Sequence, residues 1–235
     1  MISVCMATFN GAKYVKEQID SILPQLDNND ELVISDDGSR DETCSIISSY
    51  DDPRIKLLYN KGKHGFVGNF ENALSHAMGD IIVLSDQDDV WKPKKLFVLL
   101  GYLKQYDLIV HDAELIDGEG HSLHKNYYSC IHSKNGFWAN FLKPRFLGCC
   151  MAFRKTVLQS SLPFVSERRG HDYWIGCIAL LKFRVAFVPD VLIQYRRHGG
   201  NVTPSSEKTA NSLFAKSLKR LDMLFSLLLR LMHVK

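Results

Sequence analysis

The sequence predicts an α/β protein with a mostly parallel central sheet flanked by helices. Short apolar runs alternate with helical patterns along the first half of the chain, which is typical of strands joined by crossover helices. Polar, acid-rich segments follow three of these runs. The chain has 235 residues with 46% hydrophobic content, so it can bury a full core, and we expect one domain.

The expected strands are apolar and short, and they cover residues 2–7, 32–34, 54–59, 80–84 and 108–110. A helix pattern follows each of the first four strands. The first of these helices carries Val15, Ile19 and Ile22, with Leu26 near its end, and the second carries Thr43, Ile46 and Ile47. The third and fourth are expected over residues 69–78 and 92–105.

Three polar loops follow expected strands, at Thr8–Gly11, Ser35–Asp41 and Ser85–Asp89. In open α/β sheets, ligands bind beyond the carboxyl ends of the strands, so these loops are expected to converge on one nucleotide site. Asp36 and Asp37 alone would equally suit a turn that caps the next helix. The glycines of residues 62–68 lack the dinucleotide-binding spacing and indicate a flexible loop.

The strongest chemical signal is the segment at residues 85–91, Ser-Asp-Gln-Asp-Asp-Val-Trp. Its three carboxylates, Asp86, Asp88 and Asp89, repel one another, and a cation or the hydroxyl groups of a ligand would offset that repulsion. An all-oxygen ligand set favours Mg²⁺ or Mn²⁺ over zinc. The alternative is an acidic surface turn that caps the following helix.

Two segments of the second half place polar residues beside apolar runs. Asp172 precedes the helical run 175–181, where it would cap the helix, stay ionised in the helix dipole and also be available as a general base. The stretch 148–153, which includes Cys149, is expected to be a buried strand or the lining of an acceptor pocket. Residues 195–201 supply two arginines and His198, either opposite a diphosphate or as surface charges.

Composition excludes other classes of protein. The net charge is +3, with no basic stripe interleaved with aromatic residues, so we do not expect a nucleic-acid partner. The six cysteines show no paired spacing and are expected to be reduced and mostly buried. The chain opens on an apolar strand without a basic leader, and no apolar run is long enough to span a bilayer. A cytoplasmic protein, or one peripheral on the cytosolic membrane face, is expected.

These motifs together resemble the family 2 inverting glycosyltransferases. The resemblance is carried by residues 6–11, 35–39, 85–91, 171–172 and 195–199, and it covers about residues 1–203. Ser-Asp-Gln-Asp-Asp-Val-Trp is similar to the bacterial branch that includes rhamnosyltransferases of polysaccharide and O-antigen synthesis. The resemblance implies a single GT-A-type domain over residues 1–206, with a nucleotide-sugar half (1–112) and an acceptor half (113–206), and a tail over 207–235.

The resemblance also implies roles for single residues. Asp37 would contact the base of a nucleotide-sugar donor of the dTDP-rhamnose or UDP-hexose type, and Asp172 would be the catalytic base. The other implied donor-binding residues are Ala7, Thr8, Asn10, Asp36, Asp86, Asp88, Arg196 and Arg197. The implied metal ligands, for Mg²⁺ or Mn²⁺, are Asp88, Asp89 and His198. The implied contacts of the glycan or lipid-linked glycan acceptor are His171, Trp174 and Cys149.

Two other functions stay open at this point. A sugar nucleotidyltransferase also uses paired acids and a metal, but it would carry a glycine-rich phosphate loop with Lys or Arg after the first strand, and residues 8–12 are not such a loop. A non-catalytic sugar-binding module would leave His171-Asp172 and the acidic loop without a chemical role.

The tail combines an apolar stripe with basic residues. The stripe repeats at steps of four and three and consists of Phe214, Leu218, Leu221, Phe225, Leu228 and Met232. The basic border consists of Lys216, Lys219, Arg220 and Arg230. This pattern is typical of a helix that lies on an anionic membrane, and equally of a helix that packs on the domain or on a second subunit as a homodimer.

Overall fold

The computed structural model describes residues 1–131, 136–165, 170–199 and 213–233. The strands are β1 (Ile2–Thr8), β2 (Glu31–Asp36), β3 (Ile55–Tyr59), β4 (Ile81–Asp86), β5 (Val90–Trp91), β6 (Leu108–Ile116), β7 (Ser122–Asn126), β8 (Met151–Arg154) and β9 (Val185–Arg196). The α-helices are α1 (Val15–Ile22), α2 (Thr43–Ser48), α3 (Phe66–Ser75), α4 (Lys95–Tyr102), α5 (Tyr127–Ile131), α6 (Phe137–Leu142), α7 (Lys155–Ser161), α8 (His171–Lys182) and α9 (Leu213–His233). Two short 3₁₀ helices are η1 (Leu23–Gln25) and η2 (Gly148–Cys150).

The strands form one sheet in the order β3-β2-β1-β4-β8-β6-β9-β5, and β7 pairs with β6. The α/β prediction is confirmed, but the sheet is mixed rather than mostly parallel. The β3-β2-β1-β4 half is parallel, whereas β8 runs antiparallel to both β4 and β6. The direction of β8 depends on the path of the chain across the sheet, and an apolar run does not encode it.

Some helices and strands have bounds that differ from those expected. Gly65 adopts φ 93° and starts α3 at residue 66, so the expected flexible loop 62–68 is helical from that residue on. Val67, Phe70 and Leu74 continue the inward face of α3, which explains the early start. Pro93 and the left-handed Lys94 delay α4 to residue 95. The expected strand at 148–153 begins only at residue 151, after the turn η2.

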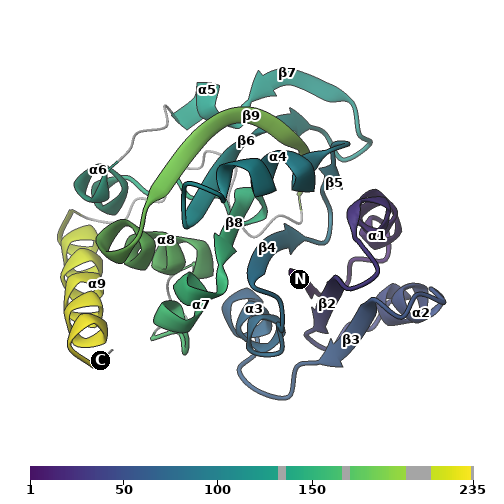
Figure 1. The fold of residues 1–235 in the computed structure, drawn as a ribbon, viewed down its shortest axis with the longest axis horizontal. Coiled ribbons are helices and arrows are strands. Elements are labelled where there is room, and N and C mark those ends of the chain that lie inside the picture. The colour runs from purple at the N-terminus through teal and green to yellow at the C-terminus, as the bar shows by residue number, and fades with distance from the viewer. Residues whose placement is uncertain (132–135, 166–169, 200–212, 234–235) are drawn as a thin grey trace.

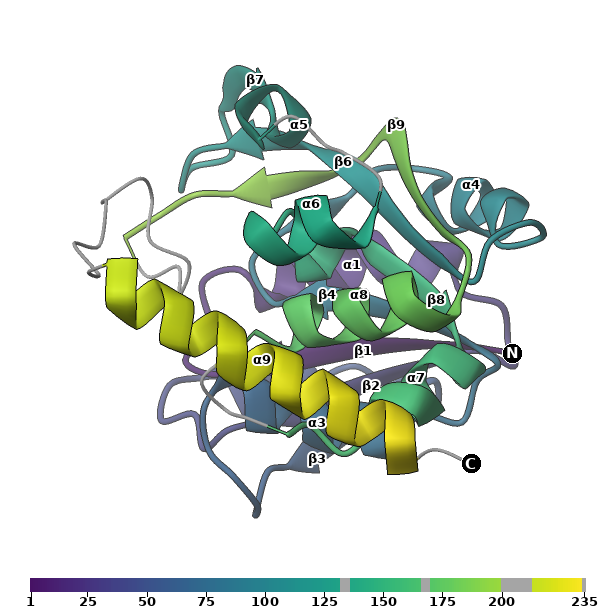
Figure 2. The same cartoon turned by 90° about the vertical axis from the view of Figure 1, so that its left-hand side faces the viewer.

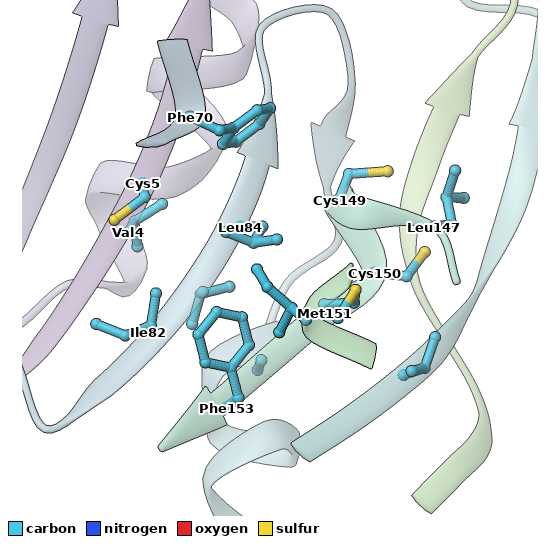
Figure 3. Packing of buried hydrophobic residues seen from close by; sticks show 14 of the residues in the cluster. Val4, Cys5, Phe70, Ile82, Leu84, Leu147, Cys149, Cys150, Met151 and Phe153 are labelled. Atoms are coloured by element: carbon cyan, nitrogen blue, oxygen red, sulfur yellow. The ribbon is translucent and has the colours of Figure 1, made fainter. Parts of the chain in front are cut away.

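The helices cover both faces of the sheet. Figure 2 shows α8 and α9 in front of the sheet and α1 behind it, and Figure 1 places α9 at the edge of the molecule beside α8. The central strands β1 and β4 are buried on both sides, as their apolar runs predict. Figure 3 shows part of this core, which includes Cys149, Cys150 and Met151. Four of the six free cysteines are buried: Cys5, Cys149, Cys150 and Cys177.

The tail forms the helix α9, as predicted for that part of the chain. Met223 and Leu227 are buried against the domain, and Arg220 and Arg230 donate hydrogen bonds to the carbonyls of Leu142 and Leu162. The apolar stripe is exposed at Leu221, Phe225, Leu228 and Met232. Residues 207–212 and the side chains of Phe214, Lys216, Leu218 and Lys219 lie outside the described residues. None of the described helices combines the length and the apolar character that crossing a membrane requires.

Candidate active site

The three polar loops meet at one edge of the sheet. Thr8 at the end of β1 lies opposite Asp36 at the end of β2, and Ala7 lies opposite Asp86 at the end of β4. The predicted convergence is therefore confirmed. The loops border a cavity of about 640 Å³, which is a size that a nucleotide sugar would suit. Its lining consists of Ala7, Thr8, Phe9, Asp37, Gly65, Phe66, Asn69, Phe70, Asp86, Gln87, Asp88, Leu147, Gly148, Gly170, His171, Asp172 and Tyr195.

The acid cluster of Asp86, Asp88 and Asp89 forms one wall. Asp86 and Asp88 line the cavity, whereas Asp89 is buried behind them, where its Oδ1 accepts the backbone N–H of Arg196 at 3.0 Å. Burial raises the pKa of Asp86 to about 7, and the nearby charges of Asp88 and Asp172 add to the effect. Burial and the charge of Asp88 also raise the pKa of Asp89. The acids therefore favour a proton or a cation among them.

The acid cluster suits a hard divalent cation. Asp89 Oδ2 is buried and has no hydrogen-bond partner among the described residues. Single ligand atoms of Asp86, Asp89 and Cys149 lie within 4.8 Å of one another. Burial raises the pKa of the Cys149 thiol well above its usual range, so Cys149 stays protonated beside the two carboxylates. The remaining ligand atoms are carboxylate oxygens, which Mg²⁺ and Mn²⁺ prefer.

The end of β9 and the residues that follow it contact this cluster. His198 Nε2 lies 2.8 Å from Asp88 Oδ2, which brings together two of the three residues implied as metal ligands. Arg196 is buried, and its side chain donates hydrogen bonds to the carbonyl of Asp88 at 2.8 Å and to Glu17 at 2.6 Å. Arg196 therefore ties the acid cluster to α1. The side chain of Arg197 is only partly buried, and its backbone N–H bonds to the carbonyl of Ile116.

The two acids after β2 differ in their surroundings. Asp36 is buried and accepts hydrogen bonds from Thr8 Oγ1 and from the backbone N–H and hydroxyl of Ser39. Burial would raise the pKa of Asp36, but the bonds from Ser39 and Thr8 outweigh burial and lower it. Asn10 Oδ1 accepts the backbone N–H of Arg40. Both Asp36 and Asn10 organise the loops, and neither lines the cavity. Asp37 lines it and is oriented by Asn60 and Gly65.

Two residues of the quoted motifs, Phe9 and Gln87, border the cavity, although the sequence alone assigns neither of them a binding or catalytic role. The Gln87 amide accepts the N–H of Phe9 at 2.9 Å and donates to the carbonyl of Phe9 at 3.1 Å, which fixes the acid loop to the first loop. The ring of Phe9 is 54% exposed at the cavity, so a flat ligand would find an aromatic face there. Their position inside the motifs was the only sequence signal for them.

Asp172 lies in the first turn of α8 and lines the same cavity as the first loop. Its carboxylate accepts the backbone N–H groups of Tyr173, at 2.7 Å, and of Gly148. A Cβ at Gly170 would lie 2.3 Å from Asp172 Oδ1, so a side chain at residue 170 would displace the carboxylate. We expected the helix dipole to keep Asp172 ionised. Burial raises its pKa to about 6, although the hydrogen bonds from the backbone act to lower the pKa. It is ionised at neutral pH and close to the range of an efficient base.

The three residues implied as acceptor contacts occupy different places. His171 lines the cavity, and its ring stacks on Phe70 with the centroids 3.9 Å apart. Burial lowers the pKa of His171 to about 3, so its ring is neutral. Trp174 is buried, donates to the carbonyl of Ser161 at 2.8 Å and does not line the cavity. Cys149 is also fully buried and contacts the acids from behind.

Comparisons with known proteins point to one family. Residues 3–162 match the family model described as Glycosyl transferase family 2. An uncharacterized glycosyltransferase of Nostoc sp. is 28% identical over 240 residues, which cover 94% of this chain and 72% of the relative. A second relative, from Escherichia coli, is named UDP-Glc:α-D-GlcNAc-diphosphoundecaprenol β-1,3-glucosyltransferase WfgD. It is 36% identical over 96 residues, which cover 41% of this chain and 38% of WfgD.

The fold is also similar to that of a solved structure. The crystal structure of Staphylococcus aureus TarS, residues 1–349 in complex with UDP-GlcNAc, superposes with a TM-score of 0.72 at 16% identity. The superposition covers 99% of this chain and 66% of that chain. The chain thus spans about two thirds of the length of the TarS fragment, and this likeness concerns the fold alone.

Proposed function

This chain belongs to glycosyltransferase family 2, and from that premise we propose that it transfers a sugar, with inversion, from a nucleoside diphosphate donor to a hydroxyl group of a glycan acceptor. One observation carries the proposal. Asp37, the pair Asp86 and Asp88, and Asp172 come from separate segments and line the same cavity. The cavity therefore offers a place for the nucleotide base at Asp37 and an acidic end for a diphosphate with its cation. It also offers a single carboxylate, that of Asp172, on the proposed acceptor side.

Asp172 is the general base of the proposed reaction. Its carboxylate takes the proton of the acceptor hydroxyl while that oxygen forms a bond to the anomeric carbon of the donor sugar. The bond between the anomeric carbon and the diphosphate oxygen breaks in the same step, and the nucleoside diphosphate leaves. One displacement inverts the configuration at that carbon. The N–H groups of Tyr173 and Gly148 hold the carboxylate in its orientation for this step.

The donor end needs positive charge opposite the diphosphate. We assign Asp88 as the principal metal ligand, because it lines the cavity and meets His198, and Asp89 as a supporting ligand behind it. When bound, Mg²⁺ or Mn²⁺ supplies charge that stabilises the leaving diphosphate. Arg197 is the arginine that we assign to the phosphates, because Arg196 is bonded to Glu17 and Asp88.

The finer assignments rest on the resemblance of residues 85–91 to the motif of the bacterial branch that includes rhamnosyltransferases. Residues 1–112 would bind the donor, of the dTDP-rhamnose or UDP-hexose type, beside Ala7, Thr8 and the ring of Phe9. Residues 113–206 would bind the acceptor, with His171 next to the attacked hydroxyl. A lipid-linked acceptor in surface polysaccharide synthesis agrees with the name of WfgD, which specifies a diphosphoundecaprenol-linked acceptor.

The function is tested by screening nucleotide sugars for release of UDP or dTDP in the presence of Mn²⁺ or Mg²⁺. The proposal expects release that depends on both a glycan acceptor and the metal, with the sugar in the inverted configuration by NMR. Release of pyrophosphate from a nucleoside triphosphate and a sugar phosphate would instead identify a nucleotidyltransferase. Binding of glycans without turnover of any donor would identify a sugar-binding module.

We predict an acid limb in the pH dependence of turnover. Burial raises the pKa of Asp172 to about 6, and only its ionised form accepts a proton, so kcat should be constant above neutral pH and fall as the pH drops through about 6. The measurement is kcat at saturating donor and acceptor across this range. A profile that stays flat to well below pH 6 would assign the proton transfer to another group.

For the tail we propose an anionic membrane surface as partner. The domain covers one face of α9 and leaves Leu221, Phe225, Leu228 and Met232 exposed. Residues 208–235 carry six basic residues and one acidic residue, a net charge of +5, which attracts anionic lipid. Each basic residue near such a surface contributes on the order of 1 kcal/mol before salt screening. Apolar burial adds to the attraction, so binding should weaken with salt without disappearing.

Flotation with vesicles tests this proposal. The full chain should float with phosphatidylglycerol vesicles at low salt, and Leu221→Gln with Phe225→Gln should strongly reduce flotation while activity on a soluble acceptor analogue is retained. Phe97→Gln is the matched control, because Phe97 is 78% exposed on α4, outside the tail. A full chain that stays with the soluble fraction contradicts the proposal, and so does a dimer in sedimentation that the double substitution dissociates.

A further inference from the structure

Lys95 is a fully buried lysine that contacts the turn η2, next to the acid cluster, through Cys149. It is the first residue of α4, and none of its surface is exposed. Its Nζ donates a hydrogen bond to the carbonyl of Cys149 at 2.9 Å and lies 4.2 Å from the centre of the Trp91 ring. Lysine is almost never fully buried unless it has a charged partner. The proposed reaction assigns no role to this ammonium group.

The hydrophobic pattern of α4 does not explain why Lys95 is inside. Two residues further along the same helix, Phe97 is 78% exposed. The helix therefore buries an ammonium group and leaves a phenyl ring in water, which is the reverse of what transfer free energies favour. Lys92 and Lys94 of the same segment stay at the surface, and Lys92 pairs with Glu114 at 2.8 Å. Something inside the domain must favour the positive charge of Lys95 in particular.

The negative charges of the buried acids Asp89 and Asp86 act on this ammonium group. Burial lowers the pKa of Lys95 to about 8, while the charges of Asp89 and Asp86 act to raise it, so the group is positively charged at neutral pH. Cys149 connects the two sides: its carbonyl accepts a hydrogen bond from Lys95, and its thiol sulfur lies within 4.8 Å of carboxylate oxygens of Asp86 and Asp89. The neighbouring residue Gly148 donates its N–H to Asp172. Lys95 thus anchors the turn η2 between the acid cluster and the proposed base.

We propose that Lys95 is the internal counter-charge of the acid cluster, a positioning residue that offsets part of the carboxylate charge before a divalent cation binds and that holds η2 in place. The inference rests on the proposed function only in taking Asp86, Asp88 and Asp89 as the cation-binding end. A lysine with a purely structural role would contribute the same stability with and without the cation. A counter-charge contributes most when the cation is absent. A bound cation offsets the same negative charge, so Lys95 then contributes less.

Thermal unfolding of Lys95→Met, in EDTA and in excess Mn²⁺, separates these roles. We expect the variant to unfold several degrees below the wild type in EDTA and to regain most of this difference in Mn²⁺. Its affinity for Mn²⁺, measured at neutral pH from the free ion by electron paramagnetic resonance, should rise by about tenfold, because one positive charge near the site is gone. Lys92→Met is the matched control, and its response to Mn²⁺ should equal that of the wild type.

Each outcome bears on one proposal. A wild-type protein that Mn²⁺ does not stabilise contradicts the metal site of the proposed function, and then Lys95 cannot act as its counter-charge. A wild type that Mn²⁺ stabilises, together with an identical Mn²⁺ response of Lys95→Met, overturns the inference about Lys95 alone. If Lys95→Met does not fold, adding Asp86→Asn should restore folding by removing one carboxylate charge. A double variant that remains unfolded also overturns the inference.

Discussion

Asp172→Asn is expected to lower kcat by about a thousandfold, because loss of a general base costs roughly two to four orders of magnitude in rate. The amide has nearly the same shape as the carboxylate and still accepts the N–H of Tyr173, so α8 should begin as in the wild type. Asparagine cannot take a proton from the acceptor hydroxyl. The measurement is steady-state transfer together with calorimetric titration of the nucleoside diphosphate.

The division between binding and turnover is the decisive part of this result. The Kd of the nucleotide should stay within about twofold of the wild type, since Asp172 acts on the acceptor side and only in the reacting state. Asp190→Asn is the matched control, because Asp190 lies on β9, accepts a hydrogen bond from the hydroxyl of Tyr102 and does not line the cavity. Wild-type turnover of the Asp172 variant would remove this residue from the mechanism, whereas equal losses in both variants would indicate a general loss of folding.

The sequence predicts the loops of the site well because they depend on local signals. The ends of β1, β2 and β4 are marked by apolar runs that give way to Thr8, Asp36 and Asp86, and parallel pairing then brings these ends together. Asp172 is recognisable for a similar reason, since an acid before an apolar helical run marks a helix start. In each case the information lies within a few residues of the position that it concerns.

The remaining features of the site depend on contacts between distant segments. Arg196 meets Glu17, 179 residues away in the chain, and no local pattern distinguishes it from its neighbour Arg197. Trp174 lies three residues from His171, and positions three apart lie on nearly the same side of a helix, yet Trp174 belongs to the core, where its indole N–H bonds to the carbonyl of Ser161. The burial of Lys95 is likewise set by Cys149, 54 residues further along the chain. The spacing of residues in the sequence does not encode such pairings. It also does not encode the antiparallel direction of β8 in the sheet.

Asp88→Ala is expected to weaken donor binding in the presence of Mn²⁺ by about a hundredfold and to abolish measurable transfer, because the diphosphate loses its metal bridge. Asp88 lines the cavity and meets His198 at 2.8 Å, so its removal affects the ligand side of the cluster. Without the metal bridge, EDTA should no longer change the affinity of the variant for nucleotide. Calorimetric titration of UDP or dTDP, with and without Mn²⁺, measures both effects.

Asp89→Ala is expected to behave differently, and the contrast tests the assignment of the two acids. Asp89 is buried and accepts the backbone N–H of Arg196, so its loss leaves a buried donor without a partner and costs about 1 to 3 kcal/mol of unfolding free energy. Asp88→Ala should lower the unfolding temperature in EDTA by less, because the partner that it loses, the ring of His198, is only partly buried and can bond to water instead. If instead Asp89→Ala keeps full stability and loses only its response to Mn²⁺, then Asp89 is the principal metal ligand and Asp88 supports it.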